Sequence, residues 1–175
     1  MIKAIETEYK DYLFRSRLEA RWAVFFDAIG VTWEYEKEGY DFDGLWYLPD
    51  FWVWEWDSFA EIKGYTEQLE DGLFKCRKLK EMTGKRSFVL YGAPDYEIYQ
   101  MIFPDVEHDG ELYYGIENPN KILQCRKCSS FWFSNTREIS YGPINRCDPK
   151  CTSEKGPFLT DVLINAHNNA KSYRF

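Results

Sequence analysis

The stretch YLPDFWVWEWDSFAEIKGY, residues 47–65, places Asp50, Glu61 and Lys63 among aromatic and aliphatic residues. Charged side chains avoid burial unless they are paired with one another or bind a metal ion. The fold must therefore keep these three groups in contact with a partner, and this requirement limits how the surrounding segments can be arranged.

Two apolar segments, 48–54 and 59–63, are separated by turn residues and predict consecutive strands. Residues two apart in a strand point the same way, so Glu61 and Lys63 share one face of the sheet. A hairpin between the strands can bring Asp50 level with Glu61. The sequence therefore predicts two carboxylates and one ammonium group in a small area.

Adjacent carboxylates repel each other and resist joint ionisation unless a cation joins them. Mg²⁺ suits such a pair because it prefers oxygen ligands and keeps several waters. A lysine beside the metal could orient or deprotonate a bound water, or stabilise charge developing on a phosphoryl group. We therefore interpret Asp50, Glu61 and Lys63 as a metal site.

The periodicity of apolar residues predicts an α/β (α+β) layer structure with two helices on a mixed sheet. In chain order we expect a helix at 12–29 ending at Gly30, strands at 31–37, 48–54 and 59–63, a helix at 66–83 capped by Thr66, a strand at 87–92, and a closing helix within 156–175. The segment 96–103 could be helix or strand, and Asp109-Gly110 predicts a hairpin turn.

Glu19 lies at the edge of the apolar side of the first helix, where it could reach a site on the sheet. The alternative is an exposed ion pair with Arg15 four residues earlier, worth a few tenths of a kcal/mol. Helix geometry gives equal support to a site role for Glu19 and to an ion pair with Arg15.

Glu19, then Pro49-Asp50, then Glu61-Ile62-Lys63, on the order helix, three strands, helix, strand, resembles the PD-(D/E)XK nuclease superfamily. The resemblance covers about residues 12–92 and implies a restriction-endonuclease-like αβββαβ core. It also implies that Glu19, Asp50 and Glu61 bind Mg²⁺ or Mn²⁺ and that Lys63 acts on the attacking water.

The spacing is similar to that of phage junction-resolving endonucleases. This resemblance implies a phage or mobile-element origin, branched DNA as a partner and a homodimer; DNA or RNA, and branched or linear substrates, are alternatives that the residues leave open. The exonuclease branch of the superfamily has a Gln-x-x-x-Tyr motif after the lysine. Gln68 is suitably placed here, but Gly72 stands where the tyrosine would be, so we do not expect a processive exonuclease.

Cys125, Cys128, Cys147 and Cys151 form the pattern C-x2-C, 18 residues, C-x3-C. Two such turns present four sulfurs to one ion, which is typical of a tetrahedral structural Zn²⁺ site. Residues between the pairs resemble the strands of a zinc ribbon. Disulfides are the alternative, which would need an oxidising compartment. Cys76 falls on the apolar side of the second helix and is interpreted as a buried thiol.

Although the net charge of the chain is -7, two segments are basic: residues 65–92 have a net charge of +2 and residues 121–175 have a net charge of +5. These segments and the first helix supply candidates for phosphate contacts: Arg15, Lys75, Lys78, Arg126 and Lys127. On the second helix, a solvated polar face explains the lysines equally well. A cluster of aromatic residues could stack on bases, although packing is the commoner reason: Trp46, Tyr47, Trp52, Trp54 and Trp56. His108 and His167 match no catalytic or metal spacing.

The composition is that of a globular protein without a membrane-spanning run or a signal-peptide pattern, so we expect a cytoplasmic location, in the host cell if phage-encoded. We divide the chain into a nuclease-like core at 1–92, an acidic connecting segment at 93–120, a zinc element at 121–155, and a helix at 156–175 packing on the core.

Two functions from different classes follow. The first is a metal-dependent endonuclease that hydrolyses DNA phosphodiester bonds, because the set Glu19, Asp50, Glu61 and Lys63 is complete. The second is a binding module on a nuclease-like fold, an adaptor or inhibitor that does not cleave, which the acidic net charge favours.

Overall fold

The computed structural model of the chain describes residues 4–98, 100–104, 106–108, 111–113, 119–134, 151 and 159–175. Its centre is a mixed five-stranded sheet in the order β3-β6-β7-β8-β9. The strands are β3 (Trp33–Tyr35), β6 (Phe51–Val53), β7 (Ser58–Lys63), β8 (Arg86–Tyr91) and β9 (Met101–Ile102). Only β7 and β8 pair in parallel, and the other three pairs are antiparallel. The predicted mixed α/β class is confirmed.

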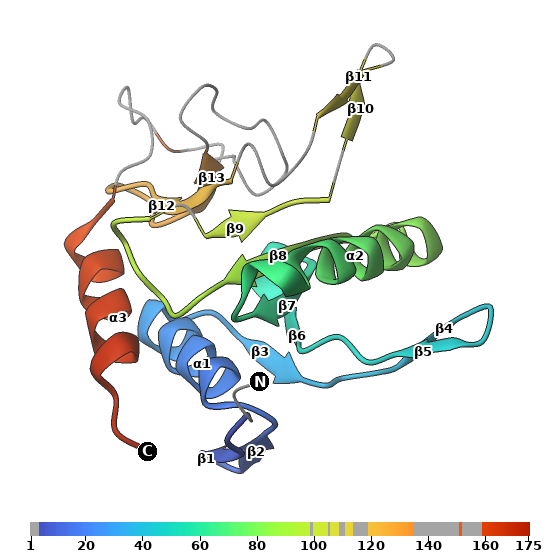
Figure 1. Cartoon of the computed structure of the whole chain (residues 1–175). Coiled ribbons are helices and arrows are strands. Elements are labelled where there is room, and N and C mark those ends of the chain that lie inside the picture. Colours follow the sequence, from blue (N-terminus) through green and yellow to red (C-terminus); the bar gives the residue numbers. More distant parts are fainter. Residues whose placement is uncertain are drawn as a thin grey trace.

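Helices cover both faces of this sheet (Figure 1). α1 (Arg17–Ile29) packs on the face that carries Phe51, Ile62 and Leu90. α2 (Leu69–Thr83) connects the parallel strands β7 and β8 and packs on the opposite face through its predicted apolar side, with Cys76 buried as expected. Apolar strand side chains alternate between the two faces of the sheet, so each face must be covered by a helix.

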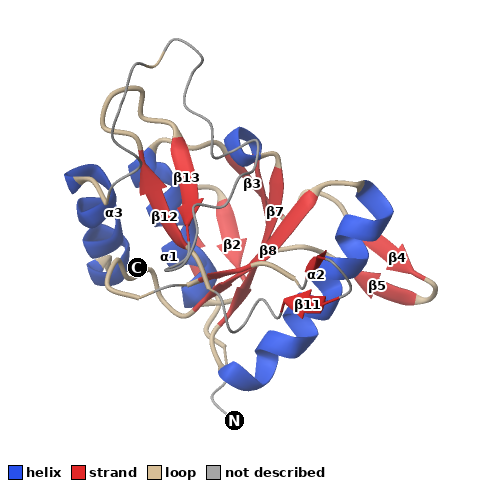
Figure 2. Cartoon of the chain, turned by 90° about the horizontal axis from the view of Figure 1, so that it is seen from above, coloured by secondary structure: helices blue, strands red, loops and turns tan. Residues whose placement is uncertain are grey.

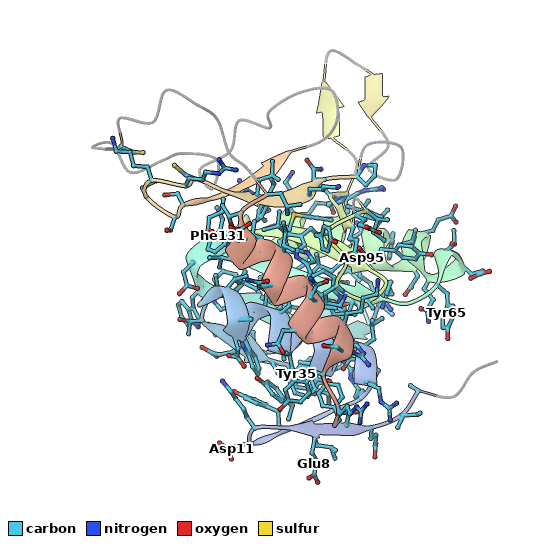
Figure 3. All side chains as sticks on the ribbon, turned by 90° about the vertical axis from the view of Figure 1, so that its left-hand side faces the viewer. Glu8, Asp11, Tyr35, Tyr65, Asp95 and Phe131 are labelled. Atoms are coloured by element: carbon cyan, nitrogen blue, oxygen red, sulfur yellow. The ribbon has the colours of Figure 1, made fainter. Side chains whose placement is uncertain are left out.

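α1 begins later than the predicted helix at 12–29. Residues 12–14 form strand β2 (Tyr12–Phe14), which pairs with β1 (Thr7–Tyr9) in a hairpin, and Glu8 points away from the molecule on this hairpin (Figure 3). The extended backbone of Ser16 ends the hairpin, and its side chain accepts a hydrogen bond from the Glu19 amide at 3.2 Å, which starts the helix. At the other end, Gly30 adopts the predicted left-handed conformation.

The second helix also starts differently. A 3₁₀ turn, η2 (Thr66–Gln68), precedes α2, and Thr66 makes no cap hydrogen bond to it. The Thr66 hydroxyl instead lies 3.2 Å from the hydroxyl of Tyr91. Another 3₁₀ turn, η1 (Trp54–Trp56), forms the predicted turn between β6 and β7.

A second hairpin, formed by β4 (Tyr40–Phe42) and β5 (Leu45–Tyr47), follows β3 and precedes β6 along the chain. It projects from the body of the protein (Figure 1). The sequence analysis did not predict it. Its two-residue turn is Asp43-Gly44, with φ of 54° and 94°, which is the backbone that such hairpins require.

The C-terminal part lies beside the sheet (Figure 2). β10 (Val106–His108) and β11 (Glu111–Tyr113) pair antiparallel, which confirms the predicted hairpin. Strand β9 lies within the segment 96–103, which the sequence left open between helix and strand. β12 (Lys121–Gln124) pairs with β13 (Phe131–Ser134), whose Phe133 ring centroid is 5.2 Å from that of Trp56 in the core. The predicted closing helix is α3 (Asp161–Ser172), which packs against α1.

Candidate functional site

One cleft of about 890 Å³ is lined by all four residues predicted to form the nuclease site. Glu19 comes from the first turn of α1, Asp50 from the residue before β6, and Glu61 and Lys63 from the end of β7. Arg15 also lines the cleft. Segments separate in the sequence thus bring the predicted carboxylates and lysine to one place.

Asp50 is buried and lines this cleft. The register pairs Phe51 with Ala60, so Asp50 comes opposite Glu61 as predicted. Its Oδ2 accepts a hydrogen bond from the Ile62 amide at 2.7 Å, and its Oδ1 forms an ion pair with Arg15 at 3.0 Å. Burial raises the pKa of Asp50 well above its ordinary value, and the charges of Glu61 and Glu19 raise it further.

Glu61 and Lys63 interact directly on one face of β7, with 2.5 Å between the Lys63 ammonium and Glu61 Oε1. The hydroxyl of Tyr47 donates a hydrogen bond to the other oxygen, Oε2, at 2.6 Å. Burial by itself lowers the pKa of Lys63, but the charge and hydrogen bond of Glu61 outweigh it, so the pKa lies above its ordinary value. Burial and the charge of Glu61 also raise the pKa of Tyr47. The lysine is therefore held as a cation beside the carboxylate.

Glu19 is buried and faces the sheet instead of pairing with Arg15. Ser16 donates a hydrogen bond to Glu19 Oε1 and Tyr35 donates one to Oε2, each at 2.6 Å. Arg15 forms its ion pairs with Asp50 and with Glu36. The surface-pair alternative for Glu19 is therefore wrong, and the helix does place a carboxylate at the cleft.

The donor set suits a hard divalent cation. Each of the six carboxylate oxygens of Glu19, Asp50 and Glu61 accepts one hydrogen bond from the protein, and a carboxylate oxygen has a further lone pair for a metal. The three carboxylates stand too far apart to share one ion as they lie, because among the described residues only a cysteine group brings three ligand atoms within 4.8 Å of one another. The mutual repulsion that raises the pKa of Asp50 is what a bound cation would relieve. The carboxylates are thus donors of the kind that Mg²⁺ prefers, but as they lie their spacing does not form a three-ligand site.

Gly72, which stands where an exonuclease-type tyrosine would be, packs against the stem of Lys63. A Cβ at this position would lie 3.1 Å from Lys63 Cε and 3.2 Å from Val89 Cγ2, tighter than an ordinary contact. A larger side chain would therefore displace Lys63. Gln68 lines the cleft and accepts a hydrogen bond from the Gly64 amide at 3.3 Å.

The aromatic cluster divides into packed and exposed members. Tyr47, Trp52 and Trp56 are buried, so packing explains them. Trp54 is half-exposed, but its indole donates a hydrogen bond to Glu34 at 2.8 Å and its ring lies under the ammonium of Lys37. Trp46 is exposed and lines the cleft.

The predicted phosphate-binding residues are dispersed. Arg15 and Lys75 line the cleft, whereas Lys78 does not and forms an ion pair with Glu81 on the same helix. Lys75 is paired with Asp71 at 2.6 Å. Arg126 and Lys127 are exposed on the turn after β12. The structure thus gathers part of the predicted set at the cleft.

A second site is formed by cysteines. The sulfurs of Cys125, Cys128 and Cys151 lie within 4.8 Å of one another, with 3.8 Å between those of Cys125 and Cys151, and could hold a metal ion. No disulfide joins any two of the described cysteines. Backbone hydrogen bonds at 2.9 Å from Ser129 to the Cys125 carbonyl and from the Cys125 amide to Ser130 close the turn that presents the first pair. Cys147, the fourth predicted ligand, lies outside the described residues.

Three residues of the carboxylate site were missed by the sequence analysis: Ser16, Tyr35 and Tyr47. Ser16 carried a usable signal, because a serine three residues before a glutamate is a capping-box pattern. The tyrosines carried none, because their hydroxyl partners are 16 and 14 residues away along the chain. Of the histidines, His167 is buried against Phe25 in the helical layer and has no part in either site.

Comparisons with known proteins give no relative: no family model, no curated protein and no solved structure matches this chain. No helix among the described residues is long and apolar enough to cross a membrane.

Proposed function

We propose that this protein is a divalent-metal-dependent endonuclease that hydrolyses phosphodiester bonds of DNA. The observation that carries the proposal is the convergence of Glu19, Asp50, Glu61 and Lys63 on one cleft. The order of α1, β3, β6, β7, α2 and β8 supports it, because this is the order that the resemblance to the PD-(D/E)XK superfamily implies.

In the proposed mechanism Glu19, Asp50 and Glu61 would hold Mg²⁺ or Mn²⁺, which requires the three carboxylates to move closer together than they lie here. The metal, when bound, would polarise the phosphate and lower the pKa of a bound water. Lys63, held as a cation by Glu61, would orient the attacking water or stabilise the negative charge that develops on the phosphoryl oxygens. Water adds to phosphorus, the bond from phosphorus to one sugar oxygen breaks, and that oxygen leaves with a proton.

Arg15 has a further part in this proposal. Its guanidinium neutralises Asp50 in the cleft, and its side chain is more than half exposed, so it can move to a phosphate. Glu36, its second partner, lies within 2.6 Å and would keep the side chain near the site.

We also propose that the cysteine site binds structural Zn²⁺, with Cys147 as the fourth ligand, since a closed thiolate shell is typical of that metal.

A plasmid-nicking assay with Mg²⁺ or Mn²⁺ tests the proposal. Asp50→Asn and Glu61→Gln keep the shape of the side chains but remove a charge that the metal needs. We expect cleavage to fall roughly a thousandfold or more, because metal catalysis contributes several kcal/mol and each 1.36 kcal/mol is about tenfold. Lys63→Ala should lose rate while still binding Mg²⁺ in calorimetry, because lysine is not a ligand.

Asp57→Asn is the matched control, since Asp57 is an exposed carboxylate that pairs with Lys85 outside the cleft. It should cleave at the wild-type rate. Wild-type rates in both Asp50→Asn and Glu61→Gln would falsify the nuclease site.

The second candidate is a binding protein that does not cleave. One observation favours it: protein donors already satisfy every carboxylate oxygen, and Arg15 and Lys63 balance two of the charges. Such a cleft would be stable without a metal ion. DNA binding without nicking at any Mg²⁺ or Mn²⁺ concentration would support this candidate.

A further inference from the structure

Two exposed aromatic side chains line the same cleft as the carboxylates. Trp46 on β5 is 67% exposed and Tyr65, just after β7, is 47% exposed. Other large aromatic side chains are exposed elsewhere on the described surface, but none of them lines this cleft. Tyr65 lies near the edge of the molecule in Figure 3. The cleft that holds the proposed reaction centre therefore also offers two ring surfaces.

Trp46 is held in place by local backbone and not by burial. The strand pairing sets Trp46 opposite Asp41, and the Asp43-Gly44 turn fixes that register. The indole rests on Gly39 so closely that a Cβ there would lie 2.1 Å from a ring carbon. Its N–H donates no hydrogen bond within the described residues. A large aromatic side chain that rests on Gly39 and is still mostly exposed is available for contact with something outside the chain.

Positively charged side chains line the same cleft as the two rings. The cleft is lined by the side chains of Arg15, Arg17 and Lys75 as well as by Lys63. Arg17 is exposed and has no ion-pair partner in the part of the chain that the structure describes. Aromatic rings interleaved with cations are the arrangement that holds an unpaired polynucleotide strand, since bases stack on the rings while phosphates contact the cations.

A base pair within a duplex stacks on its neighbours, so the rings could not reach its face. We propose that this cleft binds an unpaired polynucleotide segment, with bases stacked on Trp46 and Tyr65, and that the enzyme acts where a strand is single. The inference rests on the proposed function, which makes a nucleic acid the substrate. It adds that the bound segment of this substrate is unpaired. It gives the projecting β4–β5 hairpin a role as one wall of the binding site.

The test is fluorescence anisotropy with labelled oligothymidylate and with a blunt hairpin duplex, in buffer without added Mg²⁺. The wild-type chain should prefer oligothymidylate. Trp46→Ala should weaken oligothymidylate binding by about five- to 150-fold, because one stacked base contributes roughly 1–3 kcal/mol. Trp46→Phe should recover most of the affinity, because the ring face remains.

Trp54→Ala is the matched control, an indole that is 48% exposed but lies outside the cleft. It should leave binding unchanged. Gly39→Ala provides an independent check, because the added Cβ must displace the indole while Trp46 remains; we expect a loss between those of Trp46→Phe and Trp46→Ala. Equal losses for Trp46→Ala and Trp54→Ala, unchanged binding in Trp46→Ala, or a preference for duplex would overturn the inference.

Failure of this inference and failure of the proposed function give different results. Nicking of plasmid that depends on Asp50 and Glu61, with no effect of Trp46→Ala on oligothymidylate binding, would leave the nuclease and remove the stacking site. Trp46-dependent oligothymidylate binding without cleavage would keep the stacking site and remove the nuclease.

Discussion

The hydroxyl of Tyr47 and the carboxylate of Glu61 are joined by a 2.6 Å hydrogen bond that links the β4–β5 hairpin to the central strand β7. Both side chains are buried. Tyr47 is the one donor to Glu61 Oε2 among the described residues, and Lys63 occupies the other oxygen. A residue outside the central sheet, Tyr47, therefore helps to position Glu61, a candidate metal ligand.

Tyr47→Phe should destabilise the fold by about 1–3 kcal/mol, because it leaves a buried carboxylate oxygen without its donor. Urea unfolding measures this change. We also expect weaker Mg²⁺ binding, seen by calorimetry as a higher dissociation constant, because Glu61 loses a restraint on its orientation.

Tyr40→Phe is the control, since the Tyr40 hydroxyl donates to exposed Glu38 at 2.5 Å on the same hairpin. Its effect on the free energy of unfolding should stay within about 0.5 kcal/mol. If the two variants unfold alike, the buried hydrogen bond does not have the role assigned to it.

The sequence was sufficient to predict the carboxylate cluster because strand alternation and one hairpin register determine it. The pattern of apolar residues predicts the two strands and their register, and this register places Asp50 opposite Glu61. The tyrosine donors were not predictable in this way, since a hydroxyl finds its partner through packing between segments whose relative position no local pattern gives.

Two local errors have identifiable causes. The helix at 12–29 was extended too far toward the N-terminus because Phe14 and Leu18 happen to be spaced as helix neighbours, while the pairing of β2 with β1 prevails in the fold. The β4–β5 hairpin was missed although Asp43-Gly44 between aromatic residues is a strong hairpin signal. Its strands are too short to show a clear alternation.

Purified protein should contain about one zinc ion per chain. Elemental analysis should show that Cys128→Ser and Cys147→Ser both reduce this content, because thiolates supply the proposed shell. Cys76→Ala is the control, since Cys76 lies on the buried side of α2 and is not part of the cysteine group. Full zinc content in Cys147→Ser would remove Cys147 from the ligand set, and no zinc in the wild type under reducing conditions would remove the site.

Stability should decrease as the pH falls from about 7.5 to about 5.5, because of His167. Burial lowers its pKa, and Lys121 acts in the same direction, while Asp95 and the hydrogen bond to the Leu163 carbonyl oppose the shift. A histidine whose folded pKa is below its unfolded value of about 6.5 contributes stability above that pH and loses it as the pH falls.

His167→Gln should therefore flatten the pH dependence of the unfolding free energy in this range, as measured by urea titrations at several pH values. His108→Gln, at the other histidine of the chain, serves as the comparison. An unchanged slope in His167→Gln would show that carboxylates and not this ring determine the response.

Lys75 and Lys78 test whether the cleft or the whole basic helix contacts phosphates. Both lie on α2 and both form an ion pair within the helix, but only Lys75 lines the cleft. Each phosphate contact contributes about 0.7–0.9 to the slope of log affinity against log salt concentration. Lys75→Gln should reduce that slope by about one contact and weaken binding at low salt, whereas Lys78→Gln should leave the slope unchanged. Anisotropy titrations between about 50 and 200 mM salt measure both. Equal changes in the two variants would mean that the nucleic acid lies along the outer face of α2, and would place it away from Glu61.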